Sequence, residues 1–237
     1  MDRERRTLFV KASTHDFDYY ARPRLGLAAE ITRADVDAVR ARQRELGVPE
    51  NIEWVHQTTP SLLDAVRASG LPVEECPLLA LPADPSPTRQ GDRRVAEEVT
   101  GHVRVLAPDA DDLGRVLGAV HAGFGGSDDV VPRDPERARS MMRAGLRAVV
   151  GAYDGQGAVV GGGSHGPRDS TTELVGIAVL PRARRQGVGA AITAALVDDA
   201  RERGVRTVFL SAQDDAVARV YERVGFVRVG TACVAGA

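Results

Sequence analysis

A short stretch in the last quarter of the chain combines residue types that favour the binding of a phosphate group. Arg182, Arg184 and Arg185 crowd the start of a predicted helix, where the macrodipole is already positive and prefers acidic side chains. Gly187 and Gly189 leave the backbone N–H groups there unshielded. A multiply charged anion explains why repelling positive charges gather around uncovered donors. The stretch is therefore predicted to be a pyrophosphate cradle.

The segments on either side place this cradle between a strand and a helix. Leu174–Leu180 is short, apolar and rich in β-branched residues, and Pro181 ends it, which is typical of a buried strand. After the arginines, apolar residues recur at helical spacing on one face; they are Val188, Ile192, Ala195 and Leu196. The order of strand, tight loop and helix is the context in which a helix N-terminus binds an anion.

The glycine spacing separates this cradle from two common phosphate-binding motifs. A Walker loop requires Gly-Lys-Ser/Thr, and a dinucleotide fingerprint requires a third glycine followed by an acidic residue about 20 positions on. This sequence has neither pattern. Arg184, Gly187 and Gly189 instead match Arg/Gln-x-x-Gly-x-Gly/Ala. The stretch resembles the signature of the GNAT superfamily of acyl-CoA N-acyltransferases.

The segment Ala218–Phe226 is similar to a second landmark of these enzymes, a tyrosine-bearing helix followed by a Gly-Phe turn. On its own, Tyr221 on an amphipathic helix is equally well explained by core packing with a hydrated hydroxyl group. One feature differs from the family pattern. Many members carry Asn at the start of this helix, where this chain has Asp214 and Asp215. Asp also caps a helix, but a hydrogen bond from an Asn amide to coenzyme A would be missing.

Acyl transfer from a thioester to an amine needs a neutral amine, a stabilised oxyanion and a proton for the departing thiolate. The resemblance implies that the strand before the cradle holds pantetheine and the thioester carbonyl through its backbone N–H groups, with the Val179 N–H as the oxyanion donor. It implies that Tyr221 is the general acid that protonates the coenzyme A sulfur. The coenzyme A contacts implied in this way are Ile177, Ala178, Val179, Arg184, Arg185, Gln186, Gly187, Val188, Gly189 and Ala190.

Two residues are candidates for the general base. Glu173 begins the strand that leads to the cradle, so its carboxylate could take the amine proton through water. A solvated glutamate at the start of a strand is an equally good interpretation. His165 is a competing base, although a lone histidine in a polar loop is usually only exposed.

The elements around these residues form a complete α/β unit over residues 101–237. A strand from Val103 is followed by two helices, and a hairpin whose second strand is Ala158–Ser164 forms around the turn Asp154–Gly157. The strand from Glu173 completes a run of antiparallel strands before the cradle, and helix, strand, helix and strand follow it. This order resembles the GNAT fold. We expect a mixed, mostly antiparallel sheet flanked by helices, with 101–237 as the catalytic domain.

Residues 1–81 show part of the same order. Thr32 with Asp35 indicates a capped helix. A strand, a helix and a strand that Pro77 interrupts follow it, in the same order as after the cradle. We interpret this as a weak internal repeat, a degenerate GNAT-like half without a cradle; two unrelated runs remain the alternative. Proline-rich residues 82–100 are expected to be a linker.

Composition limits the remaining possibilities. The 237 residues are 43% hydrophobic and 27% charged, with a net charge of −2. This charge gives no reason to expect a nucleic-acid partner, and no apolar run is long enough to cross a membrane. Cys76 and Cys233 lie in apolar surroundings and are expected to be small buried hydrophobes. We expect a cytoplasmic protein, a monomer or homodimer, that binds no metal because no His or Cys pair has ligand spacing.

These observations predict an N-acetyltransferase that uses acetyl-CoA as co-substrate and a small-molecule or peptide amine as acceptor. The acidic loop Gly125–Asp129 would suit a cationic amine, although an ordinary exposed loop explains it better. A non-catalytic acyl-CoA sensor is the main alternative, and the presence of both Tyr221 and Glu173 argues against it. A tandem enzyme with two active sites is disfavoured because the first half has no cradle.

Overall fold

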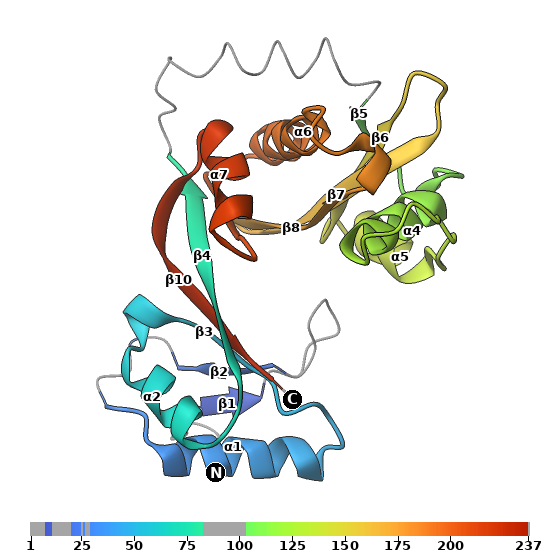
Figure 1. Cartoon of the computed structure of the whole chain (residues 1–237). Helices are drawn as coiled ribbons and strands as arrows, with labels where there is room; N and C mark the ends of the chain where they lie inside the picture. Colours follow the sequence, from blue (N-terminus) through green and yellow to red (C-terminus); the bar gives the residue numbers. More distant parts are fainter. Residues whose placement is uncertain (1–7, 11–19, 25, 27–28, 83–102, 237) are drawn as a thin grey trace. The chain divides into compact units, whose positions relative to one another are not determined.

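The chain forms two compact units in a computed structural model that describes residues 8–10, 20–24, 26, 29–82 and 103–236 (Figure 1). The N-terminal unit comprises Met1–Leu78, Ser211–Asp214 and Val229–Ala237, and the C-terminal unit comprises Leu79–Leu210 and Asp215–Arg228. The N-terminal unit thus contains segments from both ends of the chain, whereas the boundaries 1–81 and 101–237 expected from the sequence follow chain order. Apart from Pro82, the expected linker 82–100 lies outside the described residues.

The N-terminal unit is a small sheet with two helices. Its elements are β1 (Leu8–Val10), β2 (Ala21–Pro23), α1 (Arg33–Glu45), β3 (Ile52–Val55), η1 (His56–Thr58), α2 (Ser61–Ala68) and most of β4 (Val73–Leu81). Strand β10 (Val227–Ala235) supplies its residues from Val229 onward and pairs antiparallel with β3. The order of strands in this unit is β1-β2-β3-β10-β4.

Local sequence signals explain where the helices of this unit begin and end. The Thr32 side chain accepts a hydrogen bond from the Asp35 N–H, and the Asp35 carboxylate accepts one from the Thr32 N–H, which completes a capping box at the start of α1. Gly47 and Gly70 follow α1 and α2 with φ angles of 66° and 82°, which L-residues rarely adopt. The sequence predicted both ends.

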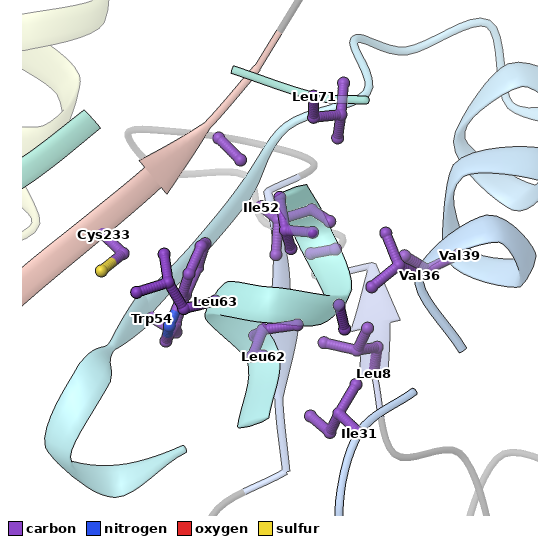
Figure 2. Close-up of a cluster of buried hydrophobic side chains, with 14 residues drawn as sticks. Leu8, Ile31, Val36, Val39, Ile52, Trp54, Leu62, Leu63, Leu71 and Cys233 are labelled. Atoms are coloured by element: carbon purple, nitrogen blue, oxygen red, sulfur yellow. The ribbon is translucent and has the colours of Figure 1, made fainter. Parts of the chain in front are cut away.

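Figure 2 shows the core of the N-terminal unit, where side chains of α1, α2 and the sheet meet. Ile52, Leu62 and Val36 are completely buried in it. Cys233 lies beside Trp54, its cross-strand partner, and is also completely buried. The expectation that Cys233 acts as a small hydrophobe is therefore confirmed. Cys76 is half-buried, and both thiols are free.

The C-terminal unit contains the remaining elements. They are β5 (Val103–Val105), α4 (Leu113–Phe124), α5 (Glu136–Arg143), β6 (Ala148–Tyr153), β7 (Val159–Arg168), β8 (Thr171–Val179), η3 (Pro181–Ala183), α6 (Val188–Glu202), β9 (Thr207–Ser211) and α7 (Asp215–Arg223). The order of strands is β4-β9-β8-β7-β6-β5. Neighbouring strands from β5 to β8 are antiparallel, and β8 and β9 are parallel. The expected mixed, mostly antiparallel sheet flanked by helices is confirmed.

Helices α4 and α6 cover opposite faces of this sheet, and glycines in β7 let them approach closely. A Cβ added at Gly162 would lie 2.7 Å from a methyl group of Val116 on α4. A Cβ added at the next residue, Gly163, would lie 3.1 Å from side-chain atoms of Ile192 and Leu196 on α6. Because successive residues of a strand face opposite sides, these contacts assign the two faces.

Two elements differ from the sequence-based expectation. Strand β4 continues through Pro77, which was expected to interrupt it; the Pro77 carbonyl oxygen accepts a hydrogen bond from the Ala212 N–H. Strand β7 extends to Arg168, beyond the end expected at Ser164. His165 therefore lies in a strand rather than in the polar loop that the sequence suggested, because antiparallel pairing with β8 continues past the run of glycines.

Candidate active site

The loop between β8 and α6 has the conformation of an anion-binding turn. Arg185 and Gly187 adopt positive φ angles of 61° and 81°. Arg185 is one of two non-glycine residues with positive φ among the described residues. Left-handed residues in such a turn direct successive N–H groups into one concavity. The strained, left-handed backbone conformation of Arg185 therefore occurs within the predicted cradle.

The first turn of α6 presents backbone donors without an internal partner. Gly187 is the N-cap residue and supplies no side-chain cap, and the first turn contains no acidic residue. The Ala191 N–H bonds to the Gly187 carbonyl oxygen at 3.0 Å. The N–H groups of Val188, Gly189 and Ala190 precede this bond, so they have no intrahelical acceptor. This turn can bind an anion through three donors and the helix dipole.

The arginines around this turn have different roles, which the sequence did not distinguish. The Arg184 guanidinium donates to the carbonyl oxygens of Gly123 and Val179, at 2.7 and 3.1 Å. It therefore joins the C-terminus of α4 to the end of β8, and its side chain forms part of the wall. Arg182 binds Asp128 through its N–H group and its guanidinium group. The Arg185 side chain is exposed and has no partner within the described part of the chain.

Strands β8 and β9 diverge before β8 reaches the cradle. Their parallel pairing covers only Thr171, Thr172 and Glu173, which pair with Thr207, Val208 and Phe209. Beyond Glu173, the edge of β8 has no partner in β9. A β-bulge follows, in which Gly176 adopts a φ angle of 64° and the register with β7 shifts. Within the described residues, the rest of β8 up to Val179 thus has no strand partner on the side where β9 diverges, and we call this side its free edge, although the Val179 carbonyl oxygen there accepts a hydrogen bond from Arg184.

The Val179 N–H points into this opening. The Leu180 N–H bonds to the Val160 carbonyl oxygen at 2.9 Å, and the preceding pair of residues is Gly161 with Val179. Because antiparallel pairs alternate between hydrogen-bonded and non-hydrogen-bonded, the N–H and C=O groups of Val179 point away from β7. The bond between its carbonyl oxygen and Arg184 agrees with this orientation. The neighbouring side chains divide between the two faces, with Ala178 towards α4 and Ile177 towards α6.

Tyr221 lies on α7, which packs against α6. The side chain is 9% exposed, and its ring makes an edge-on contact with Phe226 at a centroid distance of 6.2 Å. Burial raises the pKa of Tyr221 to about 12, so the phenol is even less ionised at neutral pH than an exposed tyrosine, whose pKa is near 10. No residue within the described part of the chain hydrogen-bonds the hydroxyl group. Tyr221 therefore has the protonation state of a general acid.

Glu173 occupies the last paired position before the strands diverge. The preceding residue, Thr172, faces α6, because its hydroxyl group contacts His165 in the network formed with Asp199 of that helix. By strand alternation, the half-buried Glu173 side chain lies on the α4 face. Glu173 thus lies where the divergence of β8 and β9 begins, six residues before Val179 along β8.

His165 is not at this opening. It is completely buried on the α6 face, bonded to Thr172 and Asp199. The alternative that His165 is the general base is therefore wrong, because α6 covers the imidazole. The sequence missed this network, and an acidic residue on the apolar face of α6 was the only signal that could have indicated it.

The acidic loop that follows α4 forms one wall of a pocket of about 600 Å³. Asp128 is bonded to Arg182, whereas Asp129 lines the pocket with His121 and Asp134. A Cβ added at Gly118 would lie 2.3 Å from the Val131 carbonyl oxygen, so this glycine lets the loop cross the helix. Since Gly123 and Val116 face the sheet, the pocket lies on the outer side of α4.

Comparison with known proteins agrees with this geometry. Residues 97–226 match the sequence model of the acetyltransferase (GNAT) family. A GCN5-related N-acetyltransferase from Kribbella flavida is 23% identical, with a TM-score of 0.64 over 92% of this chain and 80% of that one. Another from Sphaerobacter thermophilus is 19% identical, with a TM-score of 0.60 over 86% and 66%. A tandem GNAT protein from the clavulanic acid biosynthesis pathway is 16% identical, with a TM-score of 0.59 over 92% and 74%. No curated protein matches the sequence.

The chain belongs to the acetyltransferase (GNAT) family, as the sequence predicted. The fold and the family model support an acyltransferase of the N-acetyltransferase type. Within the described residues, no group of three His, Cys, Asp or Glu side chains is placed to hold a metal ion. None of the helices in the same residues is both long and apolar enough to cross a membrane.

Proposed function

We propose that the C-terminal unit transfers an acetyl group from acetyl-CoA to a primary amine, by direct attack through a tetrahedral intermediate. One observation carries the proposal: the uncapped first turn of α6 and the Val179 N–H lie at the two ends of a single loop. A pyrophosphate and a thioester of the same ligand can therefore be bound at neighbouring places.

The first turn of α6 binds the pyrophosphate in this proposal. The N–H groups of Val188, Gly189 and Ala190 donate to phosphate oxygens, and Gly187 and Gly189 let the phosphates approach the backbone. Arg185 and Gln186 are exposed beside the turn, where Arg185 offsets the charge of the ligand. Arg184 acts through its position in the wall, since its guanidinium already binds two carbonyl groups.

The free edge of β8 binds the pantetheine arm and the thioester. Ile177, Ala178 and Val179 lie beyond the point where β9 diverges, so an extended ligand can take the place of the missing strand. The Val179 N–H then stabilises the oxyanion of the intermediate, a type of contact worth about 3–4 kcal/mol in other enzymes.

Two side chains move the protons. Tyr221 is protonated at neutral pH, as a phenol of ordinary pKa also is, and burial raises its pKa further, to about 12. In this proposal it protonates the sulfur of the departing coenzyme A. Glu173, at the last paired position of β8 with β9, takes the proton of the attacking amine through water. Both groups belong to the C-terminal unit, which therefore contains every residue of the proposed site.

We further propose that the N-terminal unit is a degenerate half that binds no coenzyme A. Helix α1 corresponds to α6 in the order of elements, but the N-terminus of α1 is closed by the capping box of Thr32 and Asp35. The carboxylate at this position would repel a phosphate. The similarity in fold to a tandem GNAT protein also supports a duplicated ancestry.

A thiol-release assay with acetyl-CoA and a panel of amines, run beside a calorimetric titration of acetyl-CoA, tests the proposal. We expect binding and amine-dependent release of free thiol. A non-catalytic acyl-CoA sensor would bind the ligand without releasing thiol under any condition. Absence of binding by the folded protein would contradict both functions.

A further inference from the structure

Three buried polar side chains link β7, β8 and α6. The His165 Nδ1 atom lies 3.0 Å from the Thr172 hydroxyl oxygen, and the Nε2 atom lies 2.7 Å from an Asp199 carboxylate oxygen. Thr172, His165 and Asp199 are 1%, 0% and 8% exposed. Arg203, the residue that directly follows α6, donates to both Asp199 oxygens at 2.5 and 3.2 Å.

This network cannot itself be a reaction centre. Its residue types are those of a hydroxyl–imidazole–carboxylate triad for acyl transfer. A triad requires a nucleophile that a substrate can reach, however, and the Thr172 hydroxyl group is covered by α6. The order of contacts is also reversed, since the carboxylate binds Nε2 and the hydroxyl group binds Nδ1. The network therefore acts as an internal link.

The hydrogen bonds of the network select one neutral tautomer of His165. The carboxylate of Asp199 has the Arg203 guanidinium as its counter-ion. A neutral imidazole with its proton on Nε2 donates to Asp199 and accepts from Thr172, so every contact is satisfied. Asp199 and Arg203 are the charged groups that act on His165. Burial lowers the pKa of His165 more than the carboxylate raises it, which agrees with a neutral ring.

The network lies next to the place where β8 and β9 diverge. Thr172 pairs with Val208 on β9, and Glu173 forms the next and last pair. With the Thr172 side chain held against α6, strand alternation presents Glu173 on the opposite face. At its other end the network holds Asp199 on α6, the helix whose first turn is the proposed pyrophosphate site.

We propose that His165 is a positioning residue for acyl transfer, which fixes the last pair of β8 and β9 against α6 and thereby orients Glu173. This role rests on the proposed function. His165 therefore contributes to turnover although α6 covers it. A histidine that served only packing would make no such contribution. A displacement of about 1 Å in a reacting group can lower a rate by about a hundredfold.

The test compares three variants of the full chain. Thr172→Val removes one hydroxyl group at constant shape, His165→Leu removes both contacts of the ring, and His165→Gln keeps an amide donor towards Asp199. We expect Thr172→Val and His165→Leu to lower kcat about tenfold to a hundredfold, with the Kd of acetyl-CoA changed less than about twofold because the first turn of α6 is intact. His165→Gln should recover part of kcat. Leu196→Val, which loses only buried packing on the same helix, is the matched control.

A second measurement needs no turnover. Nitrogen-15 NMR of the histidine rings in the ligand-free protein should show His165 neutral, with its proton on Nε2. Variants that lose stability as Leu196→Val does, but keep kcat, would reduce His165 to a packing role and overturn the proposal, as would a ring protonated on Nδ1. If the wild-type protein binds acetyl-CoA but releases no thiol, the proposed function fails and the positioning role fails with it. An active wild-type protein with fully active variants refutes the positioning role alone.

Discussion

Gly189 offers a substitution that separates ligand binding from stability. A Cβ added at Gly189 would meet a single atom within 4 Å, the Val179 Cγ2 at 3.8 Å, which is an ordinary van der Waals contact. The ligand-free protein can therefore accept alanine there, and the helix gains up to about 1 kcal/mol because alanine is the better helix former. For a chain of this size, that corresponds to a rise in Tm of about 2–4 °C.

A bound pyrophosphate would meet the new side chain. Gly189 is the second residue of α6, and its N–H is one of the three proposed donors. We expect Gly189→Ala to weaken acetyl-CoA binding and Gly189→Val to weaken it by at least about tenfold, or about 1.4 kcal/mol. Calorimetric titration gives the affinity, and thermal unfolding of the same samples gives the stability.

Two glycines serve as comparisons. Gly155 has no atom within 4 Å of an added Cβ and lies in the turn between β6 and β7, so Gly155→Ala should leave the affinity unchanged. Gly187 adopts a φ angle of 81°, so Gly187→Ala should lose about 1 kcal/mol of stability through backbone strain. An affinity of Gly189→Val equal to that of the wild type, in a folded protein, would refute the pyrophosphate site and the function built on it.

Three further predictions concern catalysis, pH and stoichiometry. Tyr221→Phe keeps the ring contact with Phe226 and removes the proton donor, so kcat should fall about 10² to 10⁴-fold with the acetyl-CoA affinity nearly unchanged. An undiminished rate, in an assay limited by the chemical step, would show that Tyr221 serves only core packing. The free energy of unfolding should be highest above about pH 6.5 and fall as the pH drops below it, because burial lowers the pKa of His165 and only the unfolded chain then takes up the proton. Asp199 acts in the same direction at lower pH: burial opposes the shift, but its bonds to Arg203 and His165 lower its pKa below 3.8. Urea titrations at pH 8 to 4 check this, and a constant value down to pH 4 would contradict it. Titration with acetyl-CoA should give one site per chain, since a capping box closes the start of α1; two equivalent sites would refute the degenerate half.

The sequence by itself determined the features that depend on neighbouring residues. The cradle is one continuous stretch, in which glycines, arginines and a helix start follow each other directly, so the pattern and the geometry coincide at Gly187 and Gly189. The capping box at Thr32 is local in the same way. The order of strands and helices in residues 101–237 also followed from apolar periodicity and turn residues, because each element shows its own period.

Only the tertiary structure decided how distant segments meet. The sequence shows that residue 184 is an arginine. It does not show that the guanidinium group of Arg184 joins the end of α4 to the end of β8. His165 looked like a loop residue because glycines hide the strand pattern of β7, and only pairing with β8 and packing under α6 bury it. The direction of the Val179 N–H and the position of Glu173 depend on the residue at which β8 and β9 diverge. Pairing between strands is set by contacts far apart in the chain, and a pattern read along one strand does not contain its register.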